Sequence, residues 1–226
     1  MCGRFAFDSE TKAIEKEFNF AINQNILFKC RFNIAPQQLI AAVRETDEVR
    51  KLEYLKWGLV PFWSKDLNIG KRLINARGET ITEKPSFREA FQSRRCIVPA
   101  SGFYEWQKTS EGAKQPYYFY VMGKPIFGFA ALWEMWQDET GKELETCTII
   151  TTRANEALKP VHDRMPVILQ TQDYDEWLDE KATNTEKLQQ LLKPYPAKEM
   201  GSYQVSSDVN IPDVDSPKLI ENLNSK

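Results

Sequence analysis

The sequence predicts an α+β protein with a mostly antiparallel sheet and flanking helices. Short runs rich in β-branched and aromatic residues crowd the middle of the chain and are separated by turn residues. Helical patterns stand near the two ends and once between the strands, without a regular alternation of strand and helix. Strands that follow one another through short turns favour antiparallel pairing, because a parallel pair needs a long crossover.

The elements follow from local signals. Asp8 and Ser9 are N-cap residue types, and Ala13, Ile14 and Phe18 form the apolar stripe of a helix that ends near residue 18. Further helices are expected at about 85–93, 173–180 and 185–192. Strands are expected at 39–43, 49–55, 56–60, 96–99, 102–106, 116–121, 126–133, 147–151, 166–169 and 203–206.

The composition predicts a single globular domain over residues 1–226, with a polar tail from about residue 212. Of the 226 residues, 42% are hydrophobic and 12% aromatic, and the net charge is −2. The longest apolar run, residues 126–133, is too short to span a membrane. No basic segment followed by an apolar stretch opens the chain, so we expect a cytoplasmic protein without a secretory signal.

Cysteine and histidine usage argues against a metal site. The cysteines at positions 2, 30, 96 and 147 form no CxxC pair, and the chain has one histidine. We expect reduced thiols, with Cys96 and Cys147 in the core because apolar residues surround them. Phosphate-binding glycine motifs and HExxH are absent from the sequence, so neither a nucleotide cofactor nor a catalytic metal is expected.

Charge is distributed unevenly along the chain. Residues 1–110 carry 18 Lys/Arg and 13 Asp/Glu, whereas residues 111–226 carry 12 and 19. Within 56–95 the count is nine basic against four acidic residues. This excess suits a polyanionic partner, although scattered lysines on a solvated face would give the same count.

Cys2 follows the initiator Met1 directly. If Met1 is removed, Cys2 presents an α-amine and a thiol on one residue. Such a 1,2-aminothiol condenses with an aldehyde, first as an imine and then as a five-membered thiazolidine ring. With reference pKa values of about 8 for the amine and about 8.5 for the thiol, an adjacent base raises the reactive share of both. The alternative is that Cys2 is simply the second codon.

Polar residues in unusual settings mark further candidate positions. Asn75 opens a polar cluster after apolar residues, Glu105 lies between aromatic neighbours, and His162 is the only histidine. Desolvation between aromatic rings would raise the pKa of Glu105 and suit it to proton transfer. Each residue also has a purely structural reading, and Arg77 with Glu79 can form a surface ion pair.

Seven segments in order resemble one known family, and the similarity continues to about residue 220. They are residues 2–5, 31–36, 57–61, 75–80, 94–99, 102–106 and 162–166. Together they resemble the SOS-response-associated peptidase (SRAP) family, the abasic-site-processing proteins. The resemblance implies a barrel-like sheet, DNA repair in the SOS response, and crosslinking to abasic sites in single-stranded DNA through the mature N-terminal cysteine. It also implies peptidase removal of Met1, by the protein itself, and a lyase activity.

The family pattern assigns roles residue by residue. It implies that Cys2 is the nucleophile, that Asn75 holds its amine or the sugar, and that Glu105 and His162 are acid/base groups. DNA contacts are implied for the remaining positions: Arg4 and Arg77 on phosphates, Pro36, Phe62 and Trp63 as wedging or stacking groups, and Thr151 on the backbone. An abasic deoxyribose is mostly a closed hemiacetal, so exposing its aldehyde requires the proton transfer that such groups perform.

Two other functions remain open from the residues alone. A cysteine N-terminal-nucleophile hydrolase acting on amides or peptides would use the same Cys2. A non-enzymatic single-strand binder would need only the basic face. We expect a monomer, associated with the nucleoid if the protein is bacterial.

Overall fold

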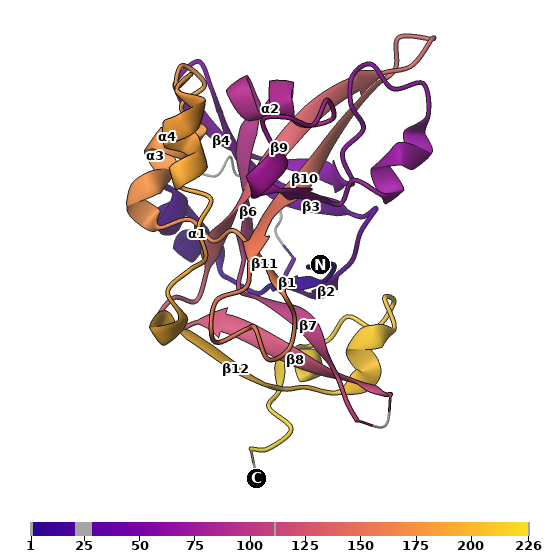
Figure 1. Ribbon diagram of the computed structural model, residues 1–226, viewed down its shortest axis with the longest axis vertical. Coiled ribbons are helices and arrows are strands. Elements are labelled where there is room, and N and C mark those ends of the chain that lie inside the picture. Colours follow the sequence, from indigo (N-terminus) through magenta and orange to yellow (C-terminus); the bar gives the residue numbers. More distant parts are fainter. Residues whose placement is uncertain (1, 21–28, 111, 226) are drawn as a thin grey trace.

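The computed structural model describes residues 2–20, 29–110 and 112–225. It has two β-sheets, and helices lie around the larger one (Figure 1). The strands are β1 Phe5–Phe7, β2 Arg31–Ile34, β3 Leu39–Thr46, β4 Val49–Trp57, β5 Asn75–Arg77, β6 Arg95–Ala100, β7 Gly102–Lys108, β8 Lys114–Val121, β9 Phe127–Gln137, β10 Glu143–Arg153, β11 Arg164–Pro166 and β12 Met200–Gln204. The helices are α1 Thr11–Phe18, α2 Arg88–Ser93, α3 Tyr174–Leu178 and α4 Thr185–Gln190. The predicted α+β class is confirmed.

Strands of the larger sheet close into a barrel, as the resemblance implied. The order β10, β4, β3, β6 and β9 is closed by pairing of β9 with β10. Neighbours in this ring are antiparallel except β4 and β10. The short strands β5 and β11 extend β10, with Asn75 opposite Ile149 and Pro166 opposite Thr151. The far end of β10 therefore gathers residues from segments that are distant in sequence.

The smaller sheet is antiparallel throughout, in the order β12, β8, β7, β1 and β2. Strand β1 lies between β7 and β2, with Phe5 opposite both Phe103 and Ile34. The amide of Tyr104 donates to the carbonyl of Arg4 at 3.0 Å, so the contact between β7 and the N-terminal segment extends beyond β1. This pairing brings the segment that contains Cys2 next to the middle of β7.

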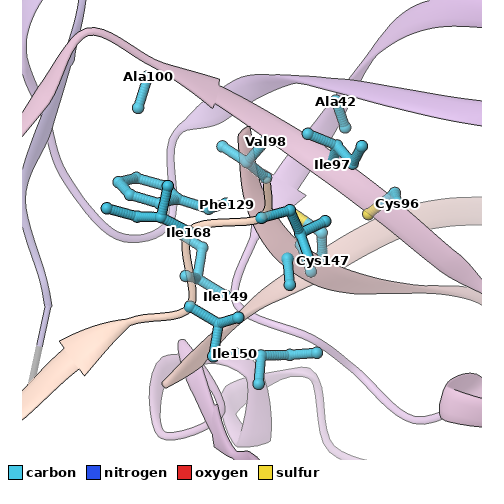
Figure 2. Close-up of a cluster of buried hydrophobic side chains, with 14 of the residues drawn as sticks. Ala42, Cys96, Ile97, Val98, Ala100, Phe129, Cys147, Ile149, Ile150 and Ile168 are labelled. Carbon is cyan, nitrogen blue, oxygen red and sulfur yellow. The ribbon is translucent and has the colours of Figure 1, made fainter. Parts of the chain in front are cut away.

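Small and branched side chains fill the barrel, and aromatic rings join it to the second sheet. Cys96 and Cys147 are fully buried among them, as expected, and all four cysteines are free (Figure 2). Burial raises the pKa of both buried thiols, which keeps them protonated. The ring of Phe129 meets those of Phe5 and Phe103 edge-on, with centroids 5.9 and 6.0 Å apart.

Gly58 ends β4 and corrects the prediction of two strands at 49–55 and 56–60. The φ angle of Gly58 is +129°, and a Cβ there would stand 2.4 Å from the carbonyl oxygen of Gly70. Only glycine fits this conformation and approach. One strand therefore runs to Trp57, and the chain leaves the barrel towards Phe62.

Other expected strands are displaced, and three strands were not expected. The strand predicted at 166–169 is β11, Arg164–Pro166, followed by an isolated bridge between Ile168 and Phe129. The strand predicted at 203–206 is β12, which starts at Met200. Strands β1, β2 and β5 have no counterpart in the prediction, because each is too short to show a period. No helix in the described part of the chain is long and apolar enough to cross a bilayer.

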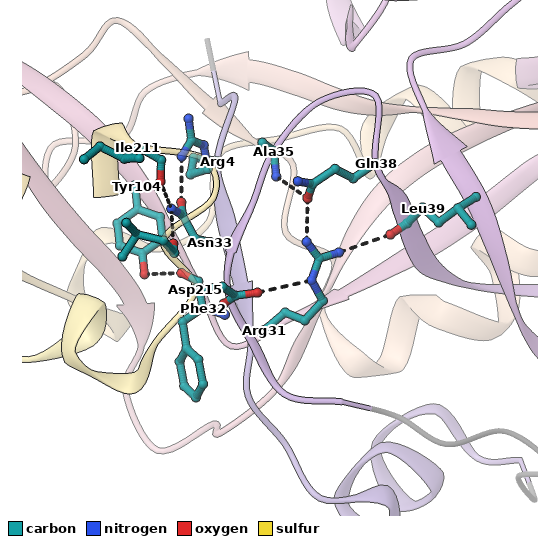
Figure 3. A network of polar contacts seen from close by, with 11 residues as sticks. Arg4, Arg31, Phe32, Asn33, Ala35, Gln38, Leu39, Tyr104, Ile211 and Asp215 are labelled. Carbon is teal, nitrogen blue, oxygen red and sulfur yellow. Dashed lines mark hydrogen bonds and ion pairs between the residues drawn. The ribbon is translucent and has the colours of Figure 1, made fainter. Parts of the chain in front are cut away.

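The C-terminal segment packs on β2 through a polar network (Figure 3). Residues 207–210 and 217–220 form 3-10 turns that bury Val209 and Leu219. The carboxylate of Asp215 accepts the Phe32 amide at 2.5 Å. The polar composition of this segment therefore reflects specific contacts with the fold.

Candidate functional site

Cys2 lies buried just before β1. Its side chain is 0% exposed, and its Sγ is 4.0 Å from the carbonyl oxygen of Arg4. Burial raises the pKa of the thiol well above its ordinary value, and the nearby charge of Glu105 raises it further. The thiol is therefore protonated at neutral pH and needs a base to react as a nucleophile.

Asn75 holds the backbone of Cys2 in place. Its Nδ2 donates to the Cys2 carbonyl oxygen at 2.9 Å. Strand β5 positions Asn75 by parallel pairing with β10. The carbonyl of Ile74, the residue before Asn75, accepts a hydrogen bond from Trp57 Nε1 at 2.8 Å. The buried Oδ1 of Asn75 has no hydrogen-bond partner within the described residues. A buried acceptor of this kind suits a donor from a bound molecule.

Glu105 extends from β7 into the same region, and its side chain is 2% exposed. Burial raises its pKa to about 7, the charge of Asp163 raises it as well, and a hydrogen bond from the Trp106 amide opposes the rise. The carboxyl group therefore populates both protonation states near neutral pH. Since its charge also acts on the Cys2 thiol, Glu105 and Cys2 share one electrostatic environment.

His162 lies in the loop that leads into β11. The amide of Arg164 donates to its Nδ1 at 2.9 Å, and an oxygen of Asp163 is 3.0 Å from the same nitrogen. Burial lowers the pKa of the imidazole, while Asp163 opposes the shift. A neutral ring accepts the hydrogen bond of the Arg164 amide at Nδ1 and carries its own proton at Nε2. A protonated ring would instead donate from Nδ1 to the carboxylate of Asp163. The loop thus offers each charge state of His162 a partner.

Arg164 is a residue of this region to which the sequence reasoning assigned no role. Its guanidinium donates to both carboxylate oxygens of Glu79, at 2.6 and 2.9 Å. It also donates to the carbonyl and hydroxyl oxygens of Thr151, at 2.7 and 3.1 Å. Glu79 therefore pairs with Arg164 and not with Arg77, which corrects the predicted ion pair. No local signal in the sequence pointed to these contacts, because Glu79 and Thr151 lie 85 and 13 residues from Arg164; the planar fork of its guanidinium explains the two-pronged bond to a carboxylate.

The residues predicted to contact DNA differ in exposure and in their bonds to the rest of the fold. Thr151 is fully buried, with its hydroxyl near Arg164 and the Ala76 carbonyl, and its reach to a DNA backbone stays a prediction. Arg77 is exposed and lines a cavity beside the His162 loop. Arg4 is tied to the fold, because its Nη1 donates to Asn33 Oδ1 at 2.7 Å and to the Val209 carbonyl at 2.6 Å (Figure 3).

The predicted wedge residues present apolar surface to solvent. Phe62 is 50% and Trp63 48% exposed, and Pro36 is partly exposed. Phe62 also lines a cavity of about 310 Å³ together with Trp133. Exposed rings such as these are available for stacking, and their contact with DNA stays a prediction.

No group of His, Cys, Asp and Glu side chains among the described residues is arranged to hold a metal ion. The amide of Asn75 bonds the Cys2 backbone, the carboxyl group of Glu105 acts on the Cys2 thiol, and the imidazole of His162 stands next in sequence to Asp163, whose charge acts on Glu105. This set can move protons around a covalent reaction at Cys2.

Comparisons with known proteins agree on one family. The family model described as SOS response associated peptidase (SRAP) matches residues 1–212. The abasic site processing protein YoqW of Bacillus subtilis is 46% identical over 224 residues, which cover 98% of this chain and 99% of that protein. The abasic site processing protein YedK of Escherichia coli is 33% identical over 82% of this chain and 83% of its own length. A crystal structure of a Bacteroides thetaiotaomicron protein superposes with a TM-score of 0.87 at 30% identity, covering 98% of this chain and 99% of that one.

Proposed function

The chain belongs to the SOS response associated peptidase (SRAP) family, and on that premise we propose that it processes abasic sites in DNA. In this proposal it binds single-stranded DNA, and the mature Cys2 captures the aldehyde of an abasic site as a thiazolidine crosslink. The observation that carries the proposal is the placement of Glu105. A buried carboxyl group with a pKa of about 7 acts on the thiol of the second residue.

The reaction begins with opening of the abasic sugar. The closed hemiacetal must gain a proton at its ring oxygen and lose one from its hydroxyl group before C1′ becomes an aldehyde. Burial favours the neutral ring of His162, and Asp163 favours its protonation; the imidazolium formed by proton uptake gives its Nε2 proton to the deoxyribose oxygen and returns to the neutral ring. Glu105 in its ionised form accepts the hydroxyl proton.

Capture then proceeds in two balanced steps. The Cys2 α-amine adds to the aldehyde carbon, and loss of one water leaves an imine. The thiol sulfur next bonds to the imine carbon, and the thiol proton is transferred to nitrogen, which closes the ring. Because burial keeps the thiol protonated, Glu105 is well placed to relay this proton. The Asn75 amide, which holds the Cys2 carbonyl, orients the reacting residue.

The α-amine of Cys2 becomes available only when Met1 is removed. Met1 lies outside the described residues. We include in the proposal that the protein hydrolyses the Met1–Cys2 peptide bond itself, in keeping with the name of its family. A mass spectrum of the purified protein, compared with that of a Cys2→Ala variant, tests this step: a Met1-free parent beside a Met1-bearing variant is expected.

One gel experiment tests the covalent function. The protein is incubated with a single-stranded oligonucleotide that contains one abasic site, and with an intact strand of the same sequence. A denaturation-resistant band with the lesion only is expected. Amide hydrolysis without such a band would favour the hydrolase alternative, and salt-sensitive binding without either would favour a plain binder.

Two variants at position 2 separate the amine from the thiol. Cys2→Ala should abolish the stable adduct while the strand still binds, because the phosphate contacts come from other residues. Cys2→Ser keeps the α-amine and should form an imine that borohydride traps. An unchanged stable adduct with Cys2→Ala would exclude thiazolidine capture.

A further inference from the structure

A cavity of about 460 Å³ lies beside the His162 loop. It is lined by Arg77, Arg153, Ala154, Lys159, Asp163 and Arg164. Its ionisable groups are therefore predominantly cations, and Asp163 at the edge is the one carboxylate among them. Clefts lined by one sign of charge concentrate counter-ions of the opposite sign.

Strand pairing explains why these cations meet. Arg77 ends β5, Arg153 ends β10 and Arg164 begins β11. The register sets Arg153 opposite Arg164 and Arg77 opposite Thr151, two residues before Arg153. Three guanidinium groups from distant segments thus converge at the end of one strand.

Lys159 enters from the turn that follows β10. Asn155 organises this turn: its Oδ1 accepts the amides of Ala157 and Leu158, both at 3.1 Å, and its Nδ2 donates to the Tyr195 carbonyl at 2.7 Å. The amide of Lys159 donates to the Asn155 carbonyl at 2.9 Å. The backbone that carries Lys159 is therefore fixed, although its side chain is exposed.

Cations outnumber carboxylates around this cavity, where Glu79 feels the charge of Arg153 and Asp163 is part of the lining. Arg164 is neutralised by Glu79 at 2.6 Å. Lys159 has only Glu156 at 3.9 Å, and these side chains are 69% and 86% exposed, so that pair is weak. The side chains of Arg77 and Arg153 form no hydrogen bond or ion pair with any residue that the structure describes.

We infer that Arg153 and Lys159, together with Arg77, bind a backbone phosphate of single-stranded DNA next to the captured sugar. The inference rests on the proposed function for DNA as the source of the phosphate. Arginine forks and lysine ammonium groups are the usual phosphate ligands, and Ala154 offers no ring on which a base could stack. The cavity thus binds the sugar-phosphate backbone and adds a DNA contact beyond the residues that perform the chemistry.

The test measures the salt dependence of binding to intact single strands. The slope of log affinity against log salt changes by about 0.7 for each phosphate neutralised on a single strand, so Arg153→Ala/Lys159→Ala, which removes two of the three cations on one phosphate, should flatten the slope by about 0.7. Between about 50 and 200 mM salt, the affinity of the parent should then fall roughly 2.6-fold more than that of the double variant. The charge-retaining variant Arg153→Lys/Lys159→Arg should keep the parental slope.

A matched control and a chemical probe locate the contact. Lys12→Ala/Lys16→Ala removes two exposed charges on α1, which contributes no residue to the cavity, and should leave the slope unchanged. In a series of strands, one phosphate at a time is replaced by a neutral methylphosphonate. The parent should bind more weakly when the replaced phosphate is the one beside the lesion. In Arg153→Ala/Lys159→Ala the same replacement should cause no further loss of affinity.

Two outcomes overturn the inference: a parental slope in Arg153→Ala/Lys159→Ala, or an equal loss in the α1 control. Failure of the proposed function would look different. The parent would then form no denaturation-resistant adduct with an abasic strand, while the salt slopes on intact strands would remain measurable.

Discussion

At the scale of single residues, burial determines the pKa of Glu105. It lies on β7 between aromatic neighbours in sequence and is 2% exposed. Burial raises its pKa to about 7, so near neutral pH it gives and takes protons with similar ease. A surface glutamate would be ionised there and would be a poor acid.

Glu105→Gln should slow adduct formation by about 10²–10⁴-fold at pH 7, which is the usual contribution of a positioned acid/base group. The amide keeps the size of the side chain but transfers no proton. The adduct rate of the parent, measured in single turnovers, should change through pH 7, and the variant should lose this inflection. A parental rate in the variant would show that Glu105 is a structural strand residue.

The same substitution should affect stability in the opposite direction. The folded pKa of about 7 lies above the ordinary 4.5, so between these values the unfolded chain holds fewer protons than the folded one. The free energy of unfolding therefore decreases as pH rises through this window. Glutamine carries no charge, so the variant should match or exceed the parent above pH 7 in urea denaturation, and the gain should disappear towards pH 4.

What the sequence could predict at this scale depended on local context. The aromatic neighbours of Glu105 were enough to predict its burial. The role of Arg164 was not accessible, because its partners Glu79 and Thr151 lie 85 and 13 residues away. Only strand pairing brings them together.

At the scale of elements, Asn33 joins β2 to the C-terminal segment. Its side chain is 0% exposed and donates to the carbonyls of Ile211 and Val214 at 2.9 and 2.6 Å. Its Oδ1 also accepts a hydrogen bond at 2.7 Å from Arg4, which is two residues from Cys2 (Figure 3). The C-terminal segment therefore contributes to the position of the segment that contains Cys2 and leads into β1.

Asn33→Ala should lower the free energy of unfolding by about 1–3 kcal/mol, because two carbonyls and one guanidinium lose a buried partner. Chemical denaturation measures this loss. Asn210→Ala is the matched control from the same segment; its side chain is exposed and accepts one bond, from Trp106, so a change within about 0.5 kcal/mol is expected. Equal effects of the two variants would contradict a structural role for Asn33.

The strands show where pattern reading succeeds and where it stops. Long apolar runs, such as the one that forms β9, predicted their strands because burial demands that composition. Strands β1, β2 and β5 have 3, 4 and 3 residues, too few for a period. Their partners are distant in sequence, and β5 pairs in parallel with β10. These three strands position Cys2, Asn33 and Asn75.

At the scale of the whole molecule, the fold gathers basic and acidic side chains into two different cavities. Arg153, Lys159 and Arg164 come from the acidic half of the chain, yet they join Arg77 in one basic cavity. A different cavity of about 670 Å³ gathers acidic side chains near α3 and α4. Its acidic lining residues are Glu45, Asp175, Glu176 and Asp179. The charge counts placed the basic excess in the N-terminal half, whereas three of the four cations that line this cavity come from the C-terminal half.

Arg77 tests whether this basic cavity serves the lesion or the strand in general. If Arg77 holds a phosphate, Arg77→Ala should weaken binding to abasic and intact single strands by similar factors, and the salt slope should decrease by about 0.7. Its side chain forms no ion pair with the described residues, and Glu79 is engaged by Arg164, so removing it should not disturb the site by freeing a carboxylate. If Arg77 instead orders the reacting groups, the variant would lose crosslinking rate at a parental slope. Affinities at several salt concentrations, measured beside the crosslinking rate on the same preparations, distinguish the two roles.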